Sequence, residues 1–212
     1  MRWCLIEKTA NPALETRGYR DSRVREFLRR EGKFRCVYCA IHENALGGVR
    51  IFHVEHYKPK KKFPALINSL SNLYYACPIC NQFKSDDWPA EPNRSCSNCA
   101  YPDPSTVDYS TLFEIDEQSG LVKGHRVASR YMIERLYFNR PQLILERKEY
   151  FLSEEMTRSL KSYKDLIKKL SESDGEATKH LSKLAELNVR LTELINKRKD
   201  IPSYELADVR RD

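Results

Sequence analysis

Apolar and polar residues in the first half of the chain alternate over short stretches, each bounded by residues typical of turns. Apolar positions three and four apart predict an amphipathic helix that begins near Asp21. After the glycine pair at 47–48, the β-branched and aromatic run of residues 49–57 predicts a β-hairpin. Residues 73–76 form another apolar run, and Pro78 suits the first turn of a helix. The order strand, strand, helix therefore predicts a ββα unit.

The second half of the chain carries longer helical patterns. Residues 112–123 contain two short apolar runs around a polar turn and predict a second hairpin, and residues 129–137 predict a helix. A long helix is predicted from Pro141. Another helix follows the capping-box pattern of residues 173–176, and its apolar stripe consists of Leu181, Leu184, Leu187, Leu191, Leu194 and Ile195. The last two helices predict an antiparallel helical hairpin, which is most often a structural or docking element.

These elements place the chain in the α+β class, as a small ββα core wrapped by helices and followed by a C-terminal helical hairpin. We expect residues 1–33 to form an N-terminal helical extension and residues 34–90 to form the core. Residues 91–139 add a loop, a hairpin and a helix. Residues 140–212 form the helical hairpin and a tail.

The charge balance suggests a polyanionic partner. The 212 residues include 37 Lys and Arg against 30 Asp and Glu, which gives a net charge of +7. Residues 1–139 hold 21 basic and 16 acidic side chains, so +5 of the excess lies in the half that contains the core. No run of about 18 apolar residues predicts a membrane span. The first residues do not resemble a secretory signal, so we expect a cytoplasmic location.

Cysteine spacing adds a metal site to the predicted core. Six of the seven cysteines fall into Cys-x2-Cys pairs, and the first two pairs are Cys36–Cys39 and Cys77–Cys80. Without a signal for export, paired cysteines favour thiolate–metal bonds over disulfides. Four thiolates satisfy tetrahedral zinc and leave no open coordination position. We therefore expect a structural zinc ion that clamps the intervening segment; the alternative is a set of buried thiols.

The third pair, Cys96 and Cys99, leaves several interpretations open. It could bind a second metal, act as a redox pair, or consist of ordinary loop cysteines. Only Cys4, His42 or His125 could complete a second site, and none of these has a partner at ligand spacing. We therefore expect no second metal there.

The clamped segment contains the residue types that phosphodiester hydrolysis needs. Glu55 and Asn81 offer hard oxygen ligands, which suit Mg²⁺ or Mn²⁺ better than zinc. His56 follows Glu55 directly and has an unperturbed pKa that suits a general base near neutral pH. Lys84 lies one helical turn beyond Asn81 and is predicted to contact a phosphate oxygen. His53 shares a strand face with Glu55, as an auxiliary ligand or a cleft-lining residue.

At this point the sequence resembles the HNH endonuclease family. The phrases that carry the resemblance are Phe52-His53-Val54-Glu55-His56-Tyr57-Lys58-Pro59, Ser71-Asn72-Leu73 and Cys77-Pro78-Ile79-Cys80-Asn81-Gln82-Phe83-Lys84. The resemblance implies a ββα-metal fold and single-metal hydrolysis that leaves a 5′-phosphate. It also implies that His56 is the general base, that Glu55 and Asn81 bind the metal, and that Asn72 pins the loop that orients the base. The third residue of the HNH signature is Asn81 in this chain, where the family name calls for His. The chain also carries Glu55 where Asp is common. Both variants keep an oxygen ligand.

A looser resemblance extends to the HNH subunits of Septu-type and retron-associated antiviral systems. It rests on residues 55–59, on the basic loop of residues 60–64 and on the overall length. It implies an ABC/SMC-like ATPase partner, to which the C-terminal helical hairpin would dock.

We therefore expect a metal-dependent endonuclease that acts on DNA, with RNA as a further possible substrate. Four lysines after the base either contact phosphates or form a solvated run: Lys58, Lys60, Lys61 and Lys62. Nothing in the sequence indicates readout of base edges, so recognition should use backbone and shape. One alternative is a catalytically silent zinc module that binds nucleic acid or protein. Another is an adaptor built on the helical hairpin.

Overall fold

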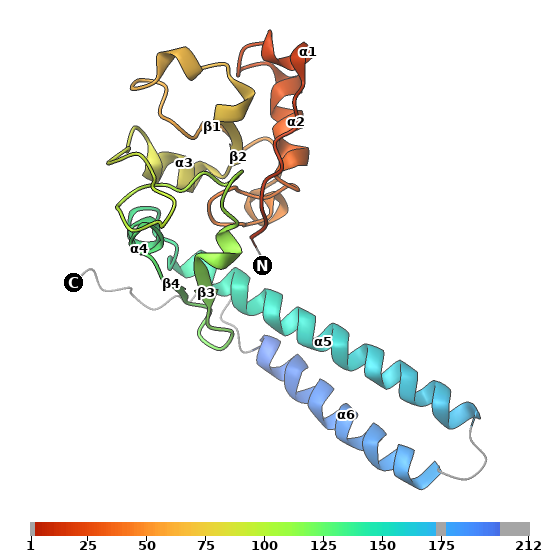
Figure 1. The fold of residues 1–212 in the computed structure, drawn as a ribbon. Coiled ribbons are helices and arrows are strands. Elements are labelled where there is room, and N and C mark those ends of the chain that lie inside the picture. The colour runs from red at the N-terminus through yellow and green to blue at the C-terminus, as the bar shows by residue number, and fades with distance from the viewer. Residues whose placement is uncertain (1–2, 173–176, 200–212) are drawn as a thin grey trace. The chain divides into compact units, whose positions relative to one another are not determined.

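The computed structural model describes residues 3–172 and 177–199, which form helices and two small sheets (Figure 1). The α-helices are α1 (Pro12–Glu15), α2 (Ser22–Glu31), α3 (Pro78–Lys84), α4 (Val127–Arg135), α5 (Pro141–Glu172) and α6 (Ala177–Lys199). The strands are β1 (His53–His56), β2 (Leu73–Ala76), β3 (Phe113–Ile115) and β4 (Val122–Gly124). Short 3-10 helices are η1 (Glu43–Leu46), η2 (Pro64–Leu66), η3 (Leu70–Asn72) and η4 (Tyr109–Thr111). This composition confirms the α+β class. The chain divides into two compact units, Met1–Ile144 and Leu145–Asp212.

The centre of the first unit is a ββα arrangement of β1, β2 and α3. The two strands are antiparallel, with His53 opposite Ala76 and His56 opposite Leu73. All four residues of β2 are buried, as expected for an apolar and aromatic run. Helix α3 follows β2 at once, because Cys77 is its N-cap and Pro78 its first residue. The chain therefore presents the end of β1 to the side chains of α3.

The hairpin predicted around the glycine pair at 47–48 is wrong. Gly47 instead ends η1, with a positive φ of 90° and its backbone N–H bonded to the Glu43 carbonyl. The strand begins only at His53 and pairs with the distant β2. Phe52 is buried and stacks on Tyr75 at a ring distance of 4.8 Å. The glycine pair does mark a turn of the chain. Glycine with a positive φ can end a helix as well as form a hairpin turn, so the residue type alone does not distinguish the two.

The first unit also contains the second predicted hairpin and the predicted short helix. Strands β3 and β4 pair antiparallel, with Phe113 opposite Gly124. Helix α4 packs on β4. Aromatic side chains fill the space around these elements, and Trp3 contacts both Phe113 and Phe138. The Trp3 indole donates a 2.7 Å hydrogen bond to the Tyr38 carbonyl, so the N-terminal segment is tied to the core.

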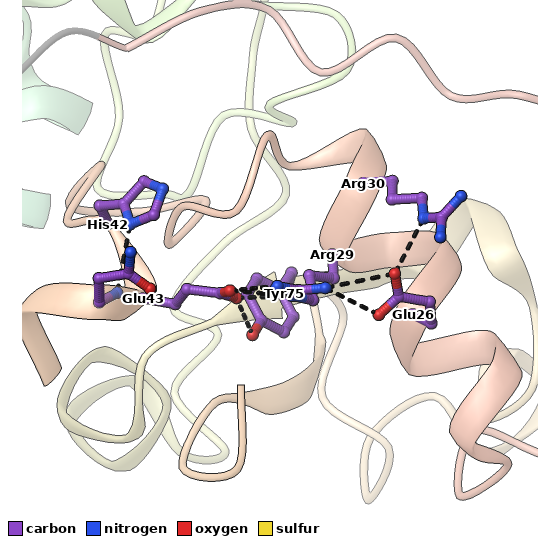
Figure 2. A network of polar contacts seen from close by, with 7 residues as sticks. Glu26, Arg29, Arg30, His42, Glu43 and Tyr75 are labelled. Carbon is purple, nitrogen blue, oxygen red and sulfur yellow. Dashed lines mark hydrogen bonds and ion pairs between the residues drawn. The ribbon is translucent and has the colours of Figure 1, made fainter. Parts of the chain in front are cut away.

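A polar network ties α2 to the sheet (Figure 2). Arg29 of α2 pairs with Glu43 of η1, with Nε 2.8 Å from Oε2, and with Glu26 at 3.0 Å. Tyr75 of β2 donates a 2.7 Å hydrogen bond to the Glu43 carboxylate. Glu43 is only 3% exposed, so its charge depends on these partners. The hydrogen bonds from Arg29 are the main cause that lowers the pKa of Glu43.

We expect Glu43→Gln to destabilise the first unit by about 1–3 kcal/mol, because a buried partner of Arg29 loses its charge. A carboxylate whose folded pKa is depressed stabilises the fold above its unfolded pKa of about 4.3 and loses that effect as pH falls further. Denaturant unfolding at neutral and acidic pH measures this. The difference between wild type and variant should shrink below about pH 4.

Glu26→Gln is the matched control, since Glu26 pairs with the same arginine but its side chain is 40% exposed. Its cost should stay below about 1 kcal/mol. Equal costs for the two variants would contradict the role assigned to Glu43.

The second unit consists of the long part of α5 and of α6, which run antiparallel (Figure 1). Glu155 pairs with Arg190 at 2.8 Å and Glu149 with Arg198 at 3.3 Å. The predicted helical hairpin is thus present, while the capping box of residues 173–176 lies outside the described residues. Among the helices that the structure describes, none combines the length and the apolar character that crossing a membrane requires.

Candidate nuclease site

Four cysteine sulfurs meet where the Cys36–Cys39 pair lies next to the start of α3. Cys36, Cys39, Cys77 and Cys80 are buried, and their Sγ atoms lie within 4.8 Å of one another. The Cys39 and Cys77 sulfurs are 3.8 Å apart, and all four thiols are free. A disulfide needs about 2.05 Å, whereas a tetrahedral ion with bonds of about 2.3 Å holds its sulfurs about 3.8 Å apart. The donor set therefore fits zinc.

Local backbone geometry brings the two Cys-x2-Cys pairs together. The Val37 N–H donates a 2.9 Å hydrogen bond to the Tyr75 carbonyl, so the first pair is fixed to β2. Ala40 has a positive φ of 57°, which turns the chain sharply after Cys39. Cys77 caps α3, and its sulfur accepts a 3.4 Å hydrogen bond from the Cys80 N–H. The four-cysteine site consequently fastens β2 and α3 to the segment before β1.

Arg140 completes the surroundings of the sulfurs. Its Nη2 lies 3.7 Å from the Sγ of Cys39, 3.9 Å from that of Cys77 and 3.8 Å from that of Cys80. The residue is 5% exposed, and its Nη1 also donates to the Leu136 carbonyl at 3.1 Å. A four-thiolate zinc centre carries a net negative charge, which a neighbouring guanidinium partly offsets. No local motif marks Arg140, so the sequence analysis missed it.

A cavity of about 480 Å³ opens beside this centre, at the end of β1. It is lined by Tyr19, His53, Val54, Glu55, His56, Pro59, Lys60, Lys61, Asn81, Ser85 and Asp86. The lining includes Glu55, His56 and Asn81, three residues that the sequence analysis assigned to catalysis. Lys60 and Lys61 supply positive charge to the same wall. The end of β1 and the start of α3 thus place a carboxylate, an amide and an imidazole around one hollow.

Glu55 is held firmly through one of its two carboxylate oxygens. Its Oε1 pairs with the Lys84 amine at 2.9 Å and accepts a 3.1 Å hydrogen bond from the Tyr38 hydroxyl. Both contacts use Oε1, which leaves Oε2 for a cation in the cavity. Burial raises the pKa of Glu55, and the charge of Lys84 opposes that rise. A bound cation would act in the same direction as Lys84 and favour the carboxylate.

His56 is oriented by the loop that follows β1. Its Nε2 lies 2.9 Å from the Ile67 carbonyl oxygen. Since a carbonyl only accepts, Nε2 carries the proton and Nδ1 is the basic nitrogen. Burial is the main cause that lowers the pKa of His56. The ring is therefore neutral near pH 7 and able to accept a proton.

Asn81 faces β1 from the first turns of α3. Its Nδ2 lies 3.0 Å from the Nδ1 of His53. Because the amide nitrogen makes this contact, Oδ1 is available as a hard oxygen ligand. His53 itself lines the cavity and also contacts the Asn81 amide, and it shares a strand face with Glu55.

Asn72 lies outside the cavity and bridges the loop behind it. Its Oδ1 accepts a 2.8 Å hydrogen bond from the Lys58 N–H. Its Nδ2 donates to the carbonyls of Lys58 at 3.1 Å and Leu66 at 3.3 Å. The next residue after Leu66 is Ile67, whose carbonyl holds His56. Asn72 thus reaches His56 through the backbone of the loop.

We expect Asn72→Asp to lower the turnover of the cleavage reaction by about 10- to 100-fold with little change in KM, since a displaced base costs rate rather than affinity. The carboxylate would face two carbonyl oxygens where the amide donates. Single-turnover kinetics with a nicked-product readout measure the effect. Ser71→Ala, at the exposed neighbouring position, should cleave at the wild-type rate; a wild-type rate for Asn72→Asp would contradict the positioning role.

Other predicted residues lie differently from the sequence expectation. Lys84 is fully buried, and its amine contacts Glu55 and, at 2.9 Å, the His56 carbonyl, so it does not line the cavity. Lys58 pairs with Glu91 at 2.9 Å, and Lys62 donates to the Trp88 carbonyl at 3.2 Å. Lys61 pairs with Asp86 at 2.5 Å. Of the four lysines, Lys60 and Lys61 are brought to the cavity wall.

Tyr19 is a further residue of the site that sequence reasoning missed. Its ring meets the His56 ring edge-on, with centroids 4.8 Å apart, and Lys60 lies 5.3 Å from its centre. Its backbone N–H donates a 3.1 Å hydrogen bond to Asn68, next to Ile67 on the loop that orients His56. The segment before α2 showed no pattern that would have linked it to the site.

Cys96 and Cys99 differ from the four clustered cysteines in their exposure to solvent. Cys96 is buried and Cys99 exposed. Among the side chains that the structure describes, the four-cysteine set is the only cluster of three or more His, Cys, Asp or Glu ligands close enough to share an ion.

Comparison with known proteins agrees with this geometry. Residues 36–87 match the family model of HNH endonucleases. The match begins at the first zinc-ligand candidate and includes β1, β2 and α3. A search of curated proteins found no match to the chain.

Proposed function

We propose that the protein is a metal-dependent endonuclease that hydrolyses phosphodiester bonds of DNA, with residues 34–90 as its catalytic core. The observation that carries this proposal is the cavity in which Glu55, His56 and Asn81 share one wall beside the four-cysteine site. A silent zinc module would not need a neutral, oriented imidazole next to two free oxygen ligands. RNA has the same phosphodiester linkage, with an added 2′-hydroxyl, and is the second substrate to test.

The roles follow from the contacts of each side chain. Glu55 and Asn81 would hold a divalent cation such as Mg²⁺ or Mn²⁺, which would supply charge neutralisation at the scissile phosphate and the leaving oxygen. Nδ1 of His56 takes a proton from the attacking water, whose oxygen forms the new bond to phosphorus. The bond from phosphorus to the 3′ oxygen breaks, so the product carries a 5′-phosphate.

Lys84 is a positioning residue in this mechanism. Its buried amine holds the carboxylate of Glu55 and the backbone of His56 at once, which fixes a ligand and the base relative to each other. Lys60 lines the cavity and contacts the substrate backbone, and Lys61 lies on the same lining with its amine paired to Asp86. The zinc centre has a structural role, because four thiolates leave no open coordination position.

A plasmid-nicking assay with a panel of metals tests the proposal. Nicking with Mg²⁺ or Mn²⁺, and none with a chelator that removes them, is the expected result. DNA binding without nicking under every metal would favour the silent zinc module instead.

We further propose that the protein acts in the cytoplasm as the nuclease of an antiviral complex with an ABC/SMC-like ATPase. The second unit supports a docking role, because five large apolar side chains on its helices are exposed: Leu160, Ile167, Leu181, Val189 and Ile195. Co-purification with such an ATPase, lost when Leu181 and Val189 are changed to serine, tests this. Unchanged co-purification of that variant would place the contact elsewhere.

A further inference from the structure

A second hollow of about 440 Å³ adjoins the catalytic cavity. It is lined by Tyr19, Arg20, Ser22, Arg25, Arg50, Phe52, His53 and Val54. Three of these residues, Tyr19, His53 and Val54, also line the catalytic cavity. The two hollows are thus neighbours, called here the two lobes of the groove, and Tyr19, whose ring meets the His56 ring, lines both.

The second lobe carries positive charge without any acidic residue in its lining. The guanidinium groups of Arg20, Arg25 and Arg50 form no ion pair with a carboxylate among the residues that the structure describes. Arg20 contacts the neighbouring Tyr19, through its hydroxyl at 3.2 Å and its ring.

Neighbouring arginines of the same segment behave differently. Arg17 and Arg23 both pair with Asp21, at 3.4 and 2.8 Å, and Arg30 pairs with Glu26 at 2.8 Å. The carboxylates of this segment therefore pair with arginines outside the lining of the second hollow, and none pairs with Arg20 or Arg25 among the described residues. Guanidinium groups left without carboxylates match the geometry and charge of phosphate.

The position of this lobe fits the geometry of a bound strand. A polynucleotide that places one phosphate at the cation site carries further phosphates on either side, with about 3.4 Å of axial rise per nucleotide in duplex DNA. Because the second lobe shares lining residues with the catalytic cavity, it lies in the place where such a flanking phosphate would bind. We infer that Arg20, Arg25 and Arg50 form a phosphate-binding subsite for the DNA backbone beside the scissile bond.

This inference rests on the proposed nuclease function for the identity of the polymer. The subsite reads charge and not bases, so its contribution is the same for unrelated sequences. It gives the N-terminal extension a role in substrate binding. The arginines around α2 are divided accordingly: those paired with carboxylates are structural, and those in the groove bind substrate.

The test measures DNA binding in a His56→Ala background, which prevents cleavage during the measurement. The variant R20A/R25A/R50A is compared with the matched control R17A/R23A/R30A, which removes the same charge from the segment that holds Arg20 and Arg25. Affinity for short duplexes of two unrelated sequences is titrated at several salt concentrations. Thermal unfolding verifies that both variants are folded.

We expect the groove variant to bind at least about tenfold more weakly than the control. The slope of log affinity against log salt should become shallower by about 0.9 for each lost phosphate contact. Equal affinity and slope for the two variants, or no measurable DNA binding by the parent protein at low salt, would overturn the inference.

Cleavage by the same arginine variants with His56 intact separates the inference from the proposed function. Cleavage that is unaffected by the groove substitutions refutes the subsite and leaves the nuclease intact. Binding that depends on the groove arginines in a protein that never cleaves supports the subsite and refutes the nuclease.

Discussion

Alanine in place of His56 is expected to lower the cleavage rate by about 10²- to 10⁴-fold, the usual contribution of a general base. The imidazole has a free Nδ1 because its Nε2 is held by the Ile67 carbonyl. Among the neighbouring side chains, Lys84 is buried against Glu55, Asn81 is not basic, and the His53 ring is bonded through its Nδ1 to the Asn81 amide. Pre-steady-state kinetics on a defined duplex with saturating metal measure the rate of the chemical step.

The expected pattern separates catalysis from folding. The His56→Ala protein should keep its zinc content, its unfolding midpoint and its affinity for DNA. His125→Ala is a matched control, because His125 is exposed and pairs with Glu114 at 3.3 Å, a residue of β3 rather than of the cavity. A His56→Ala protein that cleaves at the wild-type rate would rule out the assigned base.

Loss of the four-cysteine site should have the second large effect, on folding. Structural zinc contributes an apparent binding free energy of about 10–16 kcal/mol in small zinc domains, which is comparable to the whole stability of a typical domain, about 5–15 kcal/mol. Cys77→Ser, or removal of zinc by a chelator, is therefore expected to abolish cooperative unfolding of the core. The four sulfurs are buried within 4.8 Å of one another, and clustered buried thiolates need the charge of an ion to offset their own.

Metal analysis and near-UV circular dichroism measure the two sides of this prediction. Zinc should be present at one ion per chain in the wild type and lost in Cys77→Ser together with the aromatic signal of the core. The exposed Cys99 provides the control, and Cys99→Ser should keep both zinc and signal. A Cys77→Ser protein that retains a cooperative transition would contradict the structural role.

The sequence predicted those features that depend on local spacing. Two residues between cysteines suffice to orient both sulfurs toward one ion, so the four ligands followed from the chain alone. The ββα order and the helix from Pro78 followed from runs of apolar residues and one proline. The strand partner of β1 did not, because the turn at Gly47 closes a 3-10 helix and the pairing with β2 depends on long-range packing.

Residues that act across long sequence separations were not predictable in the same way. Arg140 reaches the sulfurs from a position 60 residues beyond Cys80, and Tyr19 reaches His56 from the N-terminal segment. The spacing of Lys84 to Asn81 predicted a contact with a phosphate. In the structure the buried Lys84 amine instead pairs with Glu55. A buried carboxylate needs a cationic partner, and that physical requirement could have suggested the pairing.

The most direct test of the site is an anomalous diffraction measurement on crystals of the His56→Ala protein, grown with Mn²⁺ and an uncleaved DNA duplex. We expect one manganese peak in the cavity, bonded to a Glu55 carboxylate oxygen, the Asn81 amide oxygen and a phosphate of the DNA. A manganese peak bonded to neither residue, with the DNA seated elsewhere, would contradict it.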